Sequence, residues 1–403
     1  MFSKKKLKNN LRYFNDLIFG LFLFLFATQL GNHFFLNFSY VNGVRVDYLS
    51  LILYTTDIVF LVLFFLNRGL VLNEIKKKAK PILLFLLFFL INALISQCPA
   101  LSFYRFLKIL EIYFIFIFFK NFKNSRVVLI SFLLGGLFQL ILSLVQLYQK
   151  SSLQGIFYFF GERYLSLSQS GVAKASVGGV EFLRPYGTFS HPNSLAGFYL
   201  LLYFFFLTDK KFNRFVFLKN LSLSVFSLLI FISFSKAATI TYLTLNIFYV
   251  IRYLKLKCRV CLLAKIVSIF IVALIFLQAK TDPLSLEKRM VLFKNGVAIF
   301  LNHPFFGVGL GHYLIYQAQI PIKYPYFFLQ PVHNIFVLFL AETGIIFFGV
   351  VGYVLWQFFK KRLKNMAFVM CLLVVLITGS FDHYWLTLQQ NWLLLGVVFG
   401  SLF

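Results

Sequence analysis

Residues 81–95 read PILLFLLFFLINALI, and this stretch decides the fold class. Its side chains are apolar on every side, whereas the strands of a membrane β-barrel alternate between apolar and polar residues. A helix that crosses a bilayer needs about 20 predominantly apolar residues. The stretch therefore predicts a membrane-spanning helix and argues against a barrel.

The composition of the whole chain extends this prediction. Of 403 residues, 60% are hydrophobic, 20% are aromatic and 13% are charged, whereas a soluble globular protein carries about 25% charged residues. So many apolar residues suffice for about twelve spans, which leaves little chain for an appended soluble enzyme domain. Because no internal repeat is visible, we expect one all-α, polytopic transmembrane domain over residues 1–403. The apolar runs that we interpret as spans cover residues 14–30, 48–66, 81–95, 101–119, 127–148, 194–207, 217–234, 237–251, 261–278, 334–359, 367–380 and 385–403.

The placement of charge sets the expected orientation. The chain has 39 lysine and arginine residues against 12 acidic ones, a formal net charge of +27, which in a soluble protein would suggest nucleic acid as the partner. Here the cations cluster after every second apolar run, as the excess of Lys and Arg in cytoplasmic loops predicts. We therefore expect a multi-pass protein with both termini in the cytoplasm, whose partner is the lipid bilayer and not nucleic acid. The clusters lie at residues 4–12, 68–80, 120–126, 210–219, 252–265 and 360–364.

Two longer polar segments, residues 149–193 and 279–333, fall on the outer side in this topology. We expect the active site there. The second segment contains a predicted amphipathic helix over residues 286–301. The sequence GVGLG at residues 307–311 predicts a tight turn, because glycine permits positive φ and close backbone approach, and the strand that precedes a nucleotide-binding loop is missing.

All six histidines lie on the predicted outer side or at its interface. Histidine is the side chain best suited to proton transfer near neutral pH. The asymmetry therefore favours an outward-facing active site over an inward-facing one. The six are His33, His191, His303, His312, His333 and His383.

The cysteines and the acids within predicted spans have structural interpretations. Cys258 and Cys261 form the only close cysteine pair, and a disulfide would not persist on the predicted cytoplasmic side. Lys108 and Glu111 are i, i+3 neighbours on one helix face, so we expect them to form an ion pair. Asp57 lies in the middle of a predicted span and has no assigned partner.

Five segments of the second half carry a resemblance to a known family. RPYGTFSHPNSLAGFYL (184–200) follows the first long outer segment, and SKAATIT (235–241) contains a lysine where the family usually has arginine. RMVLFKNGVAIFLNHPFFGVGLGHY (289–313), HNIFVLFLAETG (333–344) and FDHYWLTLQQNW (381–392) follow in order. Together they resemble motifs of the O-antigen ligase and O-antigen polymerase superfamily of bacterial membrane glycosyltransferases. The first half of the chain is similar only in topology.

The resemblance implies a GT-C-like fold and a reaction in the cytoplasmic (inner) membrane. The implied donor is a glycan on polyprenyl diphosphate, and the acceptor is a hydroxyl of a glycan or lipid-linked glycan. Fixed cations must stabilise the diphosphate as it leaves, and arginine suits phosphate oxygens. A base must take the proton of the acceptor hydroxyl. The predicted base is His333, with His303 second, and the predicted substrate-binding residues are Arg289, Arg184, Lys236, His191, Glu342 and Asp382.

Other interpretations stay open at this point. Arg184 and Lys236 also fit interfacial cations, and His191 and His303, each followed by proline, also fit loop residues. His333 and Glu342 are nine positions apart, on roughly opposite faces of a straight helix, so they need not share one site.

The rival function is a transporter or flippase of lipid-linked oligosaccharide, which would be expected to show inverted repeats and polar groups near the midplane. A sensor or structural protein would leave the histidine asymmetry unexplained. The acids on the predicted outer side are scattered, so we expect a metal-independent reaction with no cofactor. Ligase and polymerase share the same donor and stay undistinguished.

Overall fold

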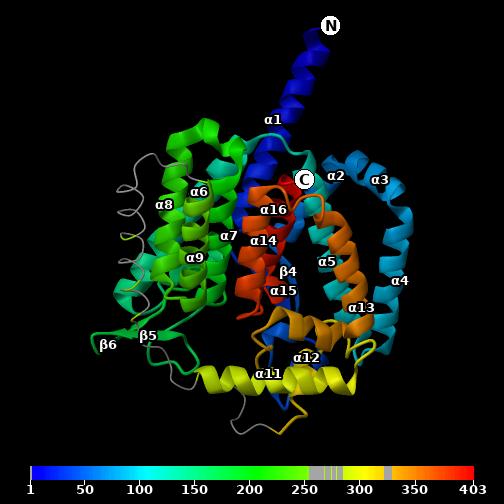
Figure 1. Cartoon of the computed structure of the whole chain (residues 1–403), viewed down its shortest axis with the longest axis vertical. Coiled ribbons are helices and arrows are strands. Elements are labelled where there is room, and N and C mark those ends of the chain that lie inside the picture. The colour runs from blue at the N-terminus through cyan, green and yellow to red at the C-terminus, as the bar shows by residue number, and fades with distance from the viewer. Residues whose placement is uncertain (1, 254–266, 268–273, 275–277, 279–284, 322–328) are drawn as a thin grey trace.

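The computed structural model describes residues 2–253, 267, 274, 278, 285–321 and 329–403. It is mostly helical, with 70% helix and 6% strand, which confirms the predicted helical membrane fold. Most helices run between the upper and lower ends of the molecule in Figure 1, and α11 lies across the lower end. The helices are α1 (Phe2–Leu25), α2 (Thr55–Leu66), α3 (Arg68–Lys77), α4 (Ala79–Ile95), α5 (Pro99–Asn121), α6 (Ser125–Gln149), α7 (Pro192–Thr208), α8 (Val216–Ile232), α9 (Lys236–Tyr253), α11 (Ser285–Asn302), α12 (Tyr313–Gln317), α13 (Ile335–Phe359), α14 (Met366–Gly379), α15 (Tyr384–Thr387) and α16 (Gln389–Ser401).

The predicted number of twelve spans is not confirmed and stays a prediction. Within the described residues, three helices are long and apolar enough to cross a membrane, or up to four if the pair α2 and α3, bent by 78°, counts as one span. The predicted run 261–278 and the pair Cys258 and Cys261 lie outside the described residues. The three helices are Ser125–Gln149, Lys210–Ile232 and Ile335–Phe359, and shorter apolar helices lie at Tyr13–Leu25, Ile82–Ile95, Pro192–Thr208 and Met366–Gly379.

Short strands are the departure from a purely helical chain. The predicted run 48–66 is helical only from Thr55 onward, because Leu51–Tyr54 pairs with Gly31–Phe34 as an antiparallel sheet. The strands are β1 (Gly31–Phe34) with β4 (Leu51–Tyr54), β2 (Tyr40–Val41) with β3 (Val44–Arg45), and β5 (Lys174–Val177) with β6 (Val180–Leu183). The 3-10 turns are η1 (Asn37–Ser39), η2 (Asp47–Leu49), η3 (Gly155–Phe160) and η4 (Lys210–Phe215).

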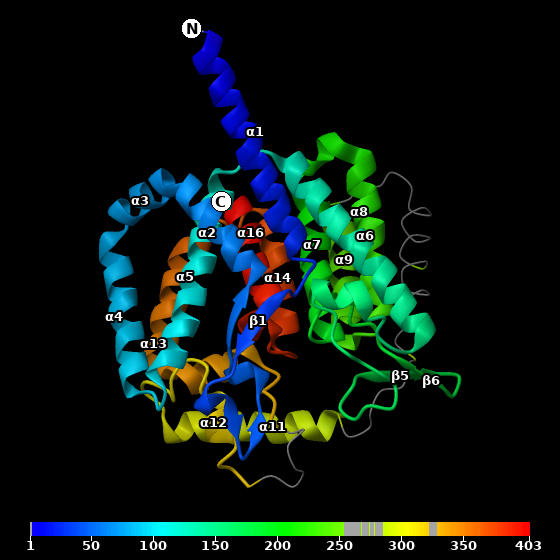
Figure 2. The ribbon, with the colours of Figure 1, turned by 180° about the vertical axis from the view of Figure 1, so that it is seen from behind.

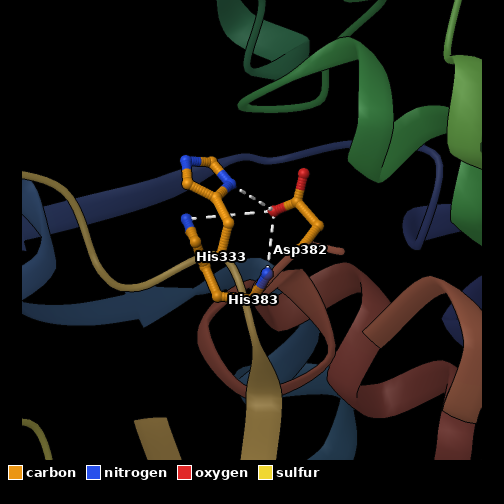
Figure 3. Close-up of side chains that lie close together, drawn as sticks. All are labelled: His333, Asp382 and His383. Carbon is orange, nitrogen blue, oxygen red and sulfur yellow. Dashed lines mark hydrogen bonds and ion pairs between the residues drawn. The ribbon is translucent and has the colours of Figure 1, made fainter. Parts of the chain in front are cut away.

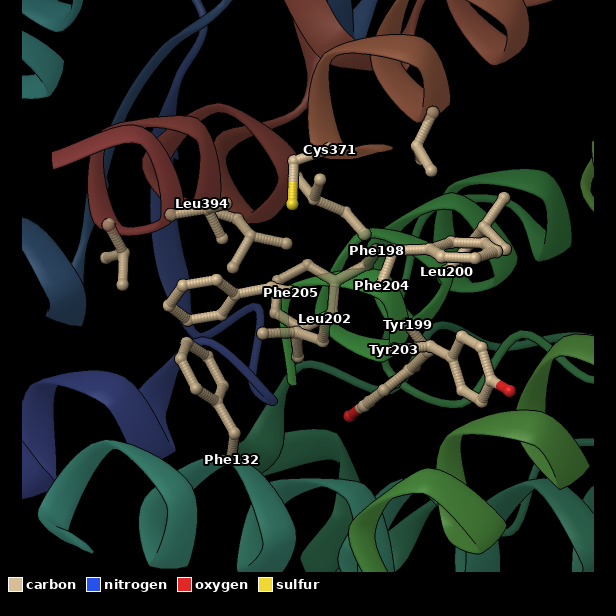
Figure 4. Close-up of a cluster of buried hydrophobic side chains, with 14 of the residues drawn as sticks. Phe132, Phe198, Tyr199, Leu200, Leu202, Tyr203, Phe204, Phe205, Cys371 and Leu394 are labelled. Atoms are coloured by element: carbon tan, nitrogen blue, oxygen red, sulfur yellow. The ribbon is translucent and has the colours of Figure 1, made fainter. Parts of the chain in front are cut away.

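Helix α7 forms the centre of the bundle. Every residue from 194 to 206 is buried, because α6, α8, α14 and α16 surround the helix. In Figure 4, Phe132 of α6, Cys371 of α14 and Leu394 of α16 pack around the side chains of α7. Gly197 lets α15 approach, since a Cβ there would lie 2.2 Å from the Tyr384 hydroxyl.

A buried charge cluster joins three helices that are far apart in sequence. Lys108 Nζ lies 2.5 Å from Asp57 Oδ2 and 3.6 Å from Glu111 Oε2. Gln389 Nε2 donates to Asp57 Oδ1 at 2.7 Å and to Glu111 Oε2 at 3.3 Å. The predicted pair of Lys108 and Glu111 is confirmed. The prediction that Asp57 lies mid-span is wrong, because the residue stands in the first turn of α2 and accepts from the backbone N–H of Tyr54 at 2.9 Å.

The amphipathic helix predicted over residues 286–301 is confirmed as α11, which buries Leu292 and Ile299. Gly296 brings it against α13, since a Cβ there would lie 2.7 Å from Val337 Cγ1. The predicted turn at residues 307–311 is also confirmed. Gly307 has φ 69°, and a Cβ there would lie 2.4 Å from the backbone of Glu342, so this position requires glycine.

Helix α13 is interrupted at Gly344, which has φ 70° and ψ 175°. The segment after α11 takes over hydrogen bonding at the break. The N–H of Ile345 donates to Pro304 O at 2.8 Å, and the N–H of Ile346 donates to Phe305 O at 3.4 Å.

Both ends of the chain lie at the upper end of the molecule, and β5, β6 and α11 lie at the lower end in the two opposite views (Figures 1 and 2). This arrangement is compatible with the predicted topology. The side of the membrane that each end faces stays a prediction.

Candidate functional site

His333, just before α13, converges with Asp382 and His383, just before α15 (Figure 3). His333 Nδ1 lies 3.4 Å from Asp382 Oδ1, and His383 Nε2 lies 4.0 Å from the same oxygen. The two imidazole rings have their centroids 5.1 Å apart. The three side chains therefore form one cluster around a carboxylate that is only 6% exposed.

Helix caps and a tight loop hold these side chains. Asn334, next to His333, caps α13 by accepting from the N–H groups of Phe336 and Val337, both at 3.0 Å. Asp382 lies in the short connection between α14 and α15, where its Oδ1 accepts from the N–H of His383 at 2.8 Å. The position of His333 thus follows from a helix N-terminus and that of Asp382 from a turn.

The start of α7 contributes the second half of the site. Asn193 Nδ2 donates to Asp382 Oδ2 at 2.8 Å, and Asn193 Oδ1 accepts from Arg184 Nη2 at 2.7 Å. His191 Nδ1 accepts from the N–H of Asn193 at 3.1 Å, which makes His191 the cap of α7. Asn193 therefore links the cation of Arg184 to the carboxylate of Asp382.

Two arginines flank the carboxylate. Arg184 is 8% exposed, and its Nε donates to Ser233 O at 2.9 Å, in the turn before α9. Arg289 of α11 donates from Nη1 to Phe381 O at 3.0 Å, directly beside Asp382. The structure thus brings together five of the predicted site residues, namely Arg184, His191, Arg289, His333 and Asp382.

The surroundings fix the charge of these groups. Burial lowers the pKa of His191 to about 3 against the opposing effect of Asp382. Burial likewise lowers the pKa of His383 to about 4, again opposed by Asp382. Burial alone would raise the pKa of Asp382, but electrostatic interaction with His333, with lesser contributions from His383 and His191, holds the pKa well below its usual value. At pH 7, Asp382 is therefore ionised, and His191 and His383 are neutral.

Arg184 keeps its charge in this environment. Burial lowers its pKa to about 10, and the neighbouring Arg289 adds to this effect. A guanidinium with a pKa near that value is protonated at neutral pH. The site therefore holds the anion of Asp382 near the guanidinium groups of Arg184, linked to it through Asn193, and of Arg289, bound to Phe381 O.

His303 and Lys236 lie apart from this cluster. His303 follows the last turn of α11 and packs edge-on against Tyr316, with ring centroids 5.1 Å apart. Arg289 lies near the other end of that helix, about 20 Å away at 1.5 Å per residue. Lys236 is the exposed first residue of α9. In the part of the chain that the structure describes, no hydrogen bond or ion pair joins Lys236 to Asp382.

Glu342 occupies a different environment from His333, as their spacing allows. Its Oε1 accepts from the Tyr48 hydroxyl at 2.8 Å and from the N–H of Tyr313 at 3.3 Å. Its own carbonyl accepts from the N–H of Gly309 at 3.0 Å. These contacts support the glycine turn, and the predicted role of Glu342 in substrate binding stays a prediction.

Asn193 and His383 are the members of the site that the sequence did not single out for a role. His383 stands next to Asp382, and Asn193 follows the His191-Pro192 pair. Both lie inside quoted motifs, so adjacency to a candidate residue was the available signal. Which side chain faces Asp382 depends on how α7 packs near α15, which no local pattern encodes.

The donor set of the cluster also suits a metal ion. One atom each of His333, Asp382 and His383 lies within 4.8 Å of the others, and His333 Nδ1 is buried without a hydrogen-bond partner. Two imidazoles and a carboxylate are ligands that divalent transition metals accept. The predicted metal independence is therefore a hypothesis that needs a direct test.

Part of the chain is similar to a known protein family. No curated protein matches the chain. A family model described as O-antigen ligase matches residues 221–349, from α8 to α13, a region that includes Lys236, Arg289, His303 and His333. Residues 221–349 are therefore similar to the O-antigen ligase family, and this match agrees with the resemblance that the sequence motifs carry.

Proposed function

We propose that this chain is a membrane glycosyltransferase that moves a glycan from polyprenyl diphosphate to a hydroxyl of an acceptor glycan at the outer face of the cytoplasmic membrane. The observation that supports it is the contact between His333 and the ionised Asp382, 3.4 Å apart, between Arg184 and Arg289. The similarity of residues 221–349 to the O-antigen ligase family supports the class of reaction.

His333 is the proposed base. Asp382 faces Nδ1, so the carboxylate favours the tautomer that carries its proton on that atom. Nε2 lies 3.4 Å from Gln330 Oε1, and its lone pair accepts the proton of the acceptor hydroxyl when the acceptor takes the place of Gln330. As the imidazole gains charge, Asp382 stabilises the imidazolium, as a carboxylate does for histidine in other hydroxyl-activating enzymes.

Arg289 is the proposed cation for the leaving group. The acceptor oxygen forms a bond to the anomeric carbon while the bond from that carbon to the diphosphate oxygen breaks, and the diphosphate gains negative charge. Among the described residues, Arg289 donates from Nη1 to Phe381 O, and a guanidinium has further N–H groups that suit phosphate oxygens. Arg184 is held at Ser233 and Asn193, so it acts on the site by positioning Asn193 and through its charge. Lys236 remains a candidate for a more distant phosphate contact.

The test uses the purified chain in vesicles with a polyprenyl-diphosphate-linked glycan and an acceptor glycan. Release of polyprenyl diphosphate together with a new glycosidic product supports the proposal. Arg289→Lys should retain part of the activity and Arg289→Ala almost none, because a point charge replaces a two-pronged group. Parallel reactions with EDTA test the metal independence. Movement of intact donor across the bilayer without product would identify the transporter instead.

A further inference from the structure

A second cluster of cations lies far from the site, around a cavity of about 430 Å³. Its walls come from the end of α5, from η4 and from the chain after α16. The end of the chain that lines it lies at the upper end of Figure 1, opposite α11. Its volume is in the range of pockets that hold small ligands.

The cavity carries more positive than negative charge. Five of its lining residues are cations, namely Lys120, Lys123, Lys210, Lys211 and Arg214.

Two of the five cations have acidic partners. Lys211 Nζ lies 2.9 Å from Asp209 Oδ2, and Lys120 Nζ lies 3.9 Å from Glu74 Oε1. Arg214 donates to the neutral Ser125 hydroxyl at 2.6 Å. The other two lining lysines have no acidic partner among the residues that the structure describes, so the cavity has an unbalanced charge that an anion would neutralise.

The remaining lining residues are three phenylalanines together with Ser125 and Ser401. Phe119, Phe122 and Phe403 line the same cavity, and Phe119 is buried against the bundle. The cavity also lies where two of the basic clusters of the sequence meet the ends of apolar helices. A ligand that matches both the cations and the phenylalanines has an anionic headgroup and apolar chains. Basic pockets between transmembrane helices bind anionic lipid headgroups in this way.

We propose that this cavity binds the phosphate headgroup of an anionic phospholipid, with its acyl chains against the partly exposed Phe122 and Phe403. The site is separate from the proposed transfer reaction. It would anchor the end of α5, η4 and the chain after α16 to one lipid.

The test compares lipid retention by the full-length protein in detergent. Native mass spectrometry after addition of phosphatidylglycerol, cardiolipin or phosphatidylcholine should show retained lipid for the first two and not for the third. The double variant Lys123→Gln/Lys210→Gln should weaken retention about tenfold or more, since each lysine near anionic lipid contributes roughly fivefold in affinity. Neither lysine pairs with an acid in the described part of the chain, so among these residues their loss leaves no carboxylate unpaired.

The matched control is Lys361→Gln/Lys364→Gln, which removes two exposed lysines of another basic cluster and should retain lipid like the wild type. Lys123→Arg/Lys210→Arg keeps both positive charges and should retain the lipid. This variant shows whether substitution at these two positions by itself disturbs the fold. Equal retention in all variants would overturn the proposal. If soluble glycerol phosphate or inorganic phosphate bound as tightly as the lipid, the ligand would be a free phosphate and the proposed lipid would be wrong.

Discussion

At the scale of single residues, the carboxylate of Asp382 is the point on which the site depends. It accepts from Asn193 and from the N–H of His383, and it faces His333. Removing it would leave neighbouring groups without their common partner. The residues around Asp382 make different contacts, so we expect their substitutions to affect transfer and stability differently.

Substitution of His333 separates chemistry from binding. His333→Gln keeps a polar side chain but cannot take up the proton, so the rate of transfer should fall by roughly 10² to 10⁴ fold with donor binding intact. His303→Gln is the matched control, because His303 lies at the other end of α11. We expect it to transfer normally. If His303→Gln lost transfer and His333→Gln kept it, the assigned base would be wrong.

Acid should destabilise the folded protein through His191. Its pKa is about 3 in the folded state because of burial and about 6.5 when unfolded, so below pH 6.5 only the unfolded chain gains the proton. The free energy of unfolding is therefore unaffected by His191 above pH 6.5, and it decreases as the pH falls from 6.5 toward 3. Asp382, Arg184, His333 and Arg289 face this ring.

The measurement is the thermal unfolding midpoint in detergent at pH 7.5 and pH 5.5. His191→Asn removes the titrating group but can still cap α7, so its midpoint should fall less than that of the wild type. The exposed His303→Asn serves as the control and should follow the wild type. An unchanged pH dependence in His191→Asn would contradict the assignment.

At the scale of elements, α11 positions Arg289 by its contact with α13. Gly296→Leu would force a side chain into the space of Val337, and such overpacking costs about 1–3 kcal/mol. The displaced helix should also lose the bond from Arg289 to Phe381, so transfer should fall with stability. Gly349→Leu, in α13 where nothing lies within 4 Å, should leave both unchanged. Thermal unfolding and transfer assays of the two variants decide this.

At the scale of the whole molecule, the buried charge cluster ties α2, α5 and α16 together. Lys108→Met leaves two carboxylates without their cation, and breaking a buried pair costs about 3–5 kcal/mol. Lys77→Met removes an ion pair whose lysine is 71% exposed, so it should cost about 1 kcal/mol or less. Adding Asp57→Asn to Lys108→Met should recover part of the loss. Equal unfolding midpoints for Lys108→Met and Lys77→Met would exclude a stabilising role for the cluster.

The sequence predicted the parts of this fold that local patterns encode. The amphipathic spacing of α11, the glycine turn at 307–311 and the pairing of Lys108 with Glu111 all depend on neighbours within one or two helical turns. The strand pairing of β1 with β4 was missed, because LILY at residues 51–54 is apolar and continues into a helical run.

The structure brings several predicted site residues together, but their arrangement was not predicted, and their roles stay predictions. Arg184, Arg289, His333 and Asp382 come from separate segments, and nothing local specifies that Asn193 bridges two of them. His303 and His333 are equivalent in sequence terms, since both stand near the predicted outer side. The length of α11 places His303 away from Arg289, whereas His333 lies beside Asp382.

The interruption of α13 at Gly344 has a consequence for local opening. The amides of Ile345 and Ile346 bond to Pro304 and Phe305, so their protection from hydrogen exchange depends on a different segment and not on their own helix. Opening of the turn after α11 would expose them together with that turn. The middle of α13 and the turn therefore form one cooperative opening unit, and exchange at these two amides would report how often the far end of α11 detaches.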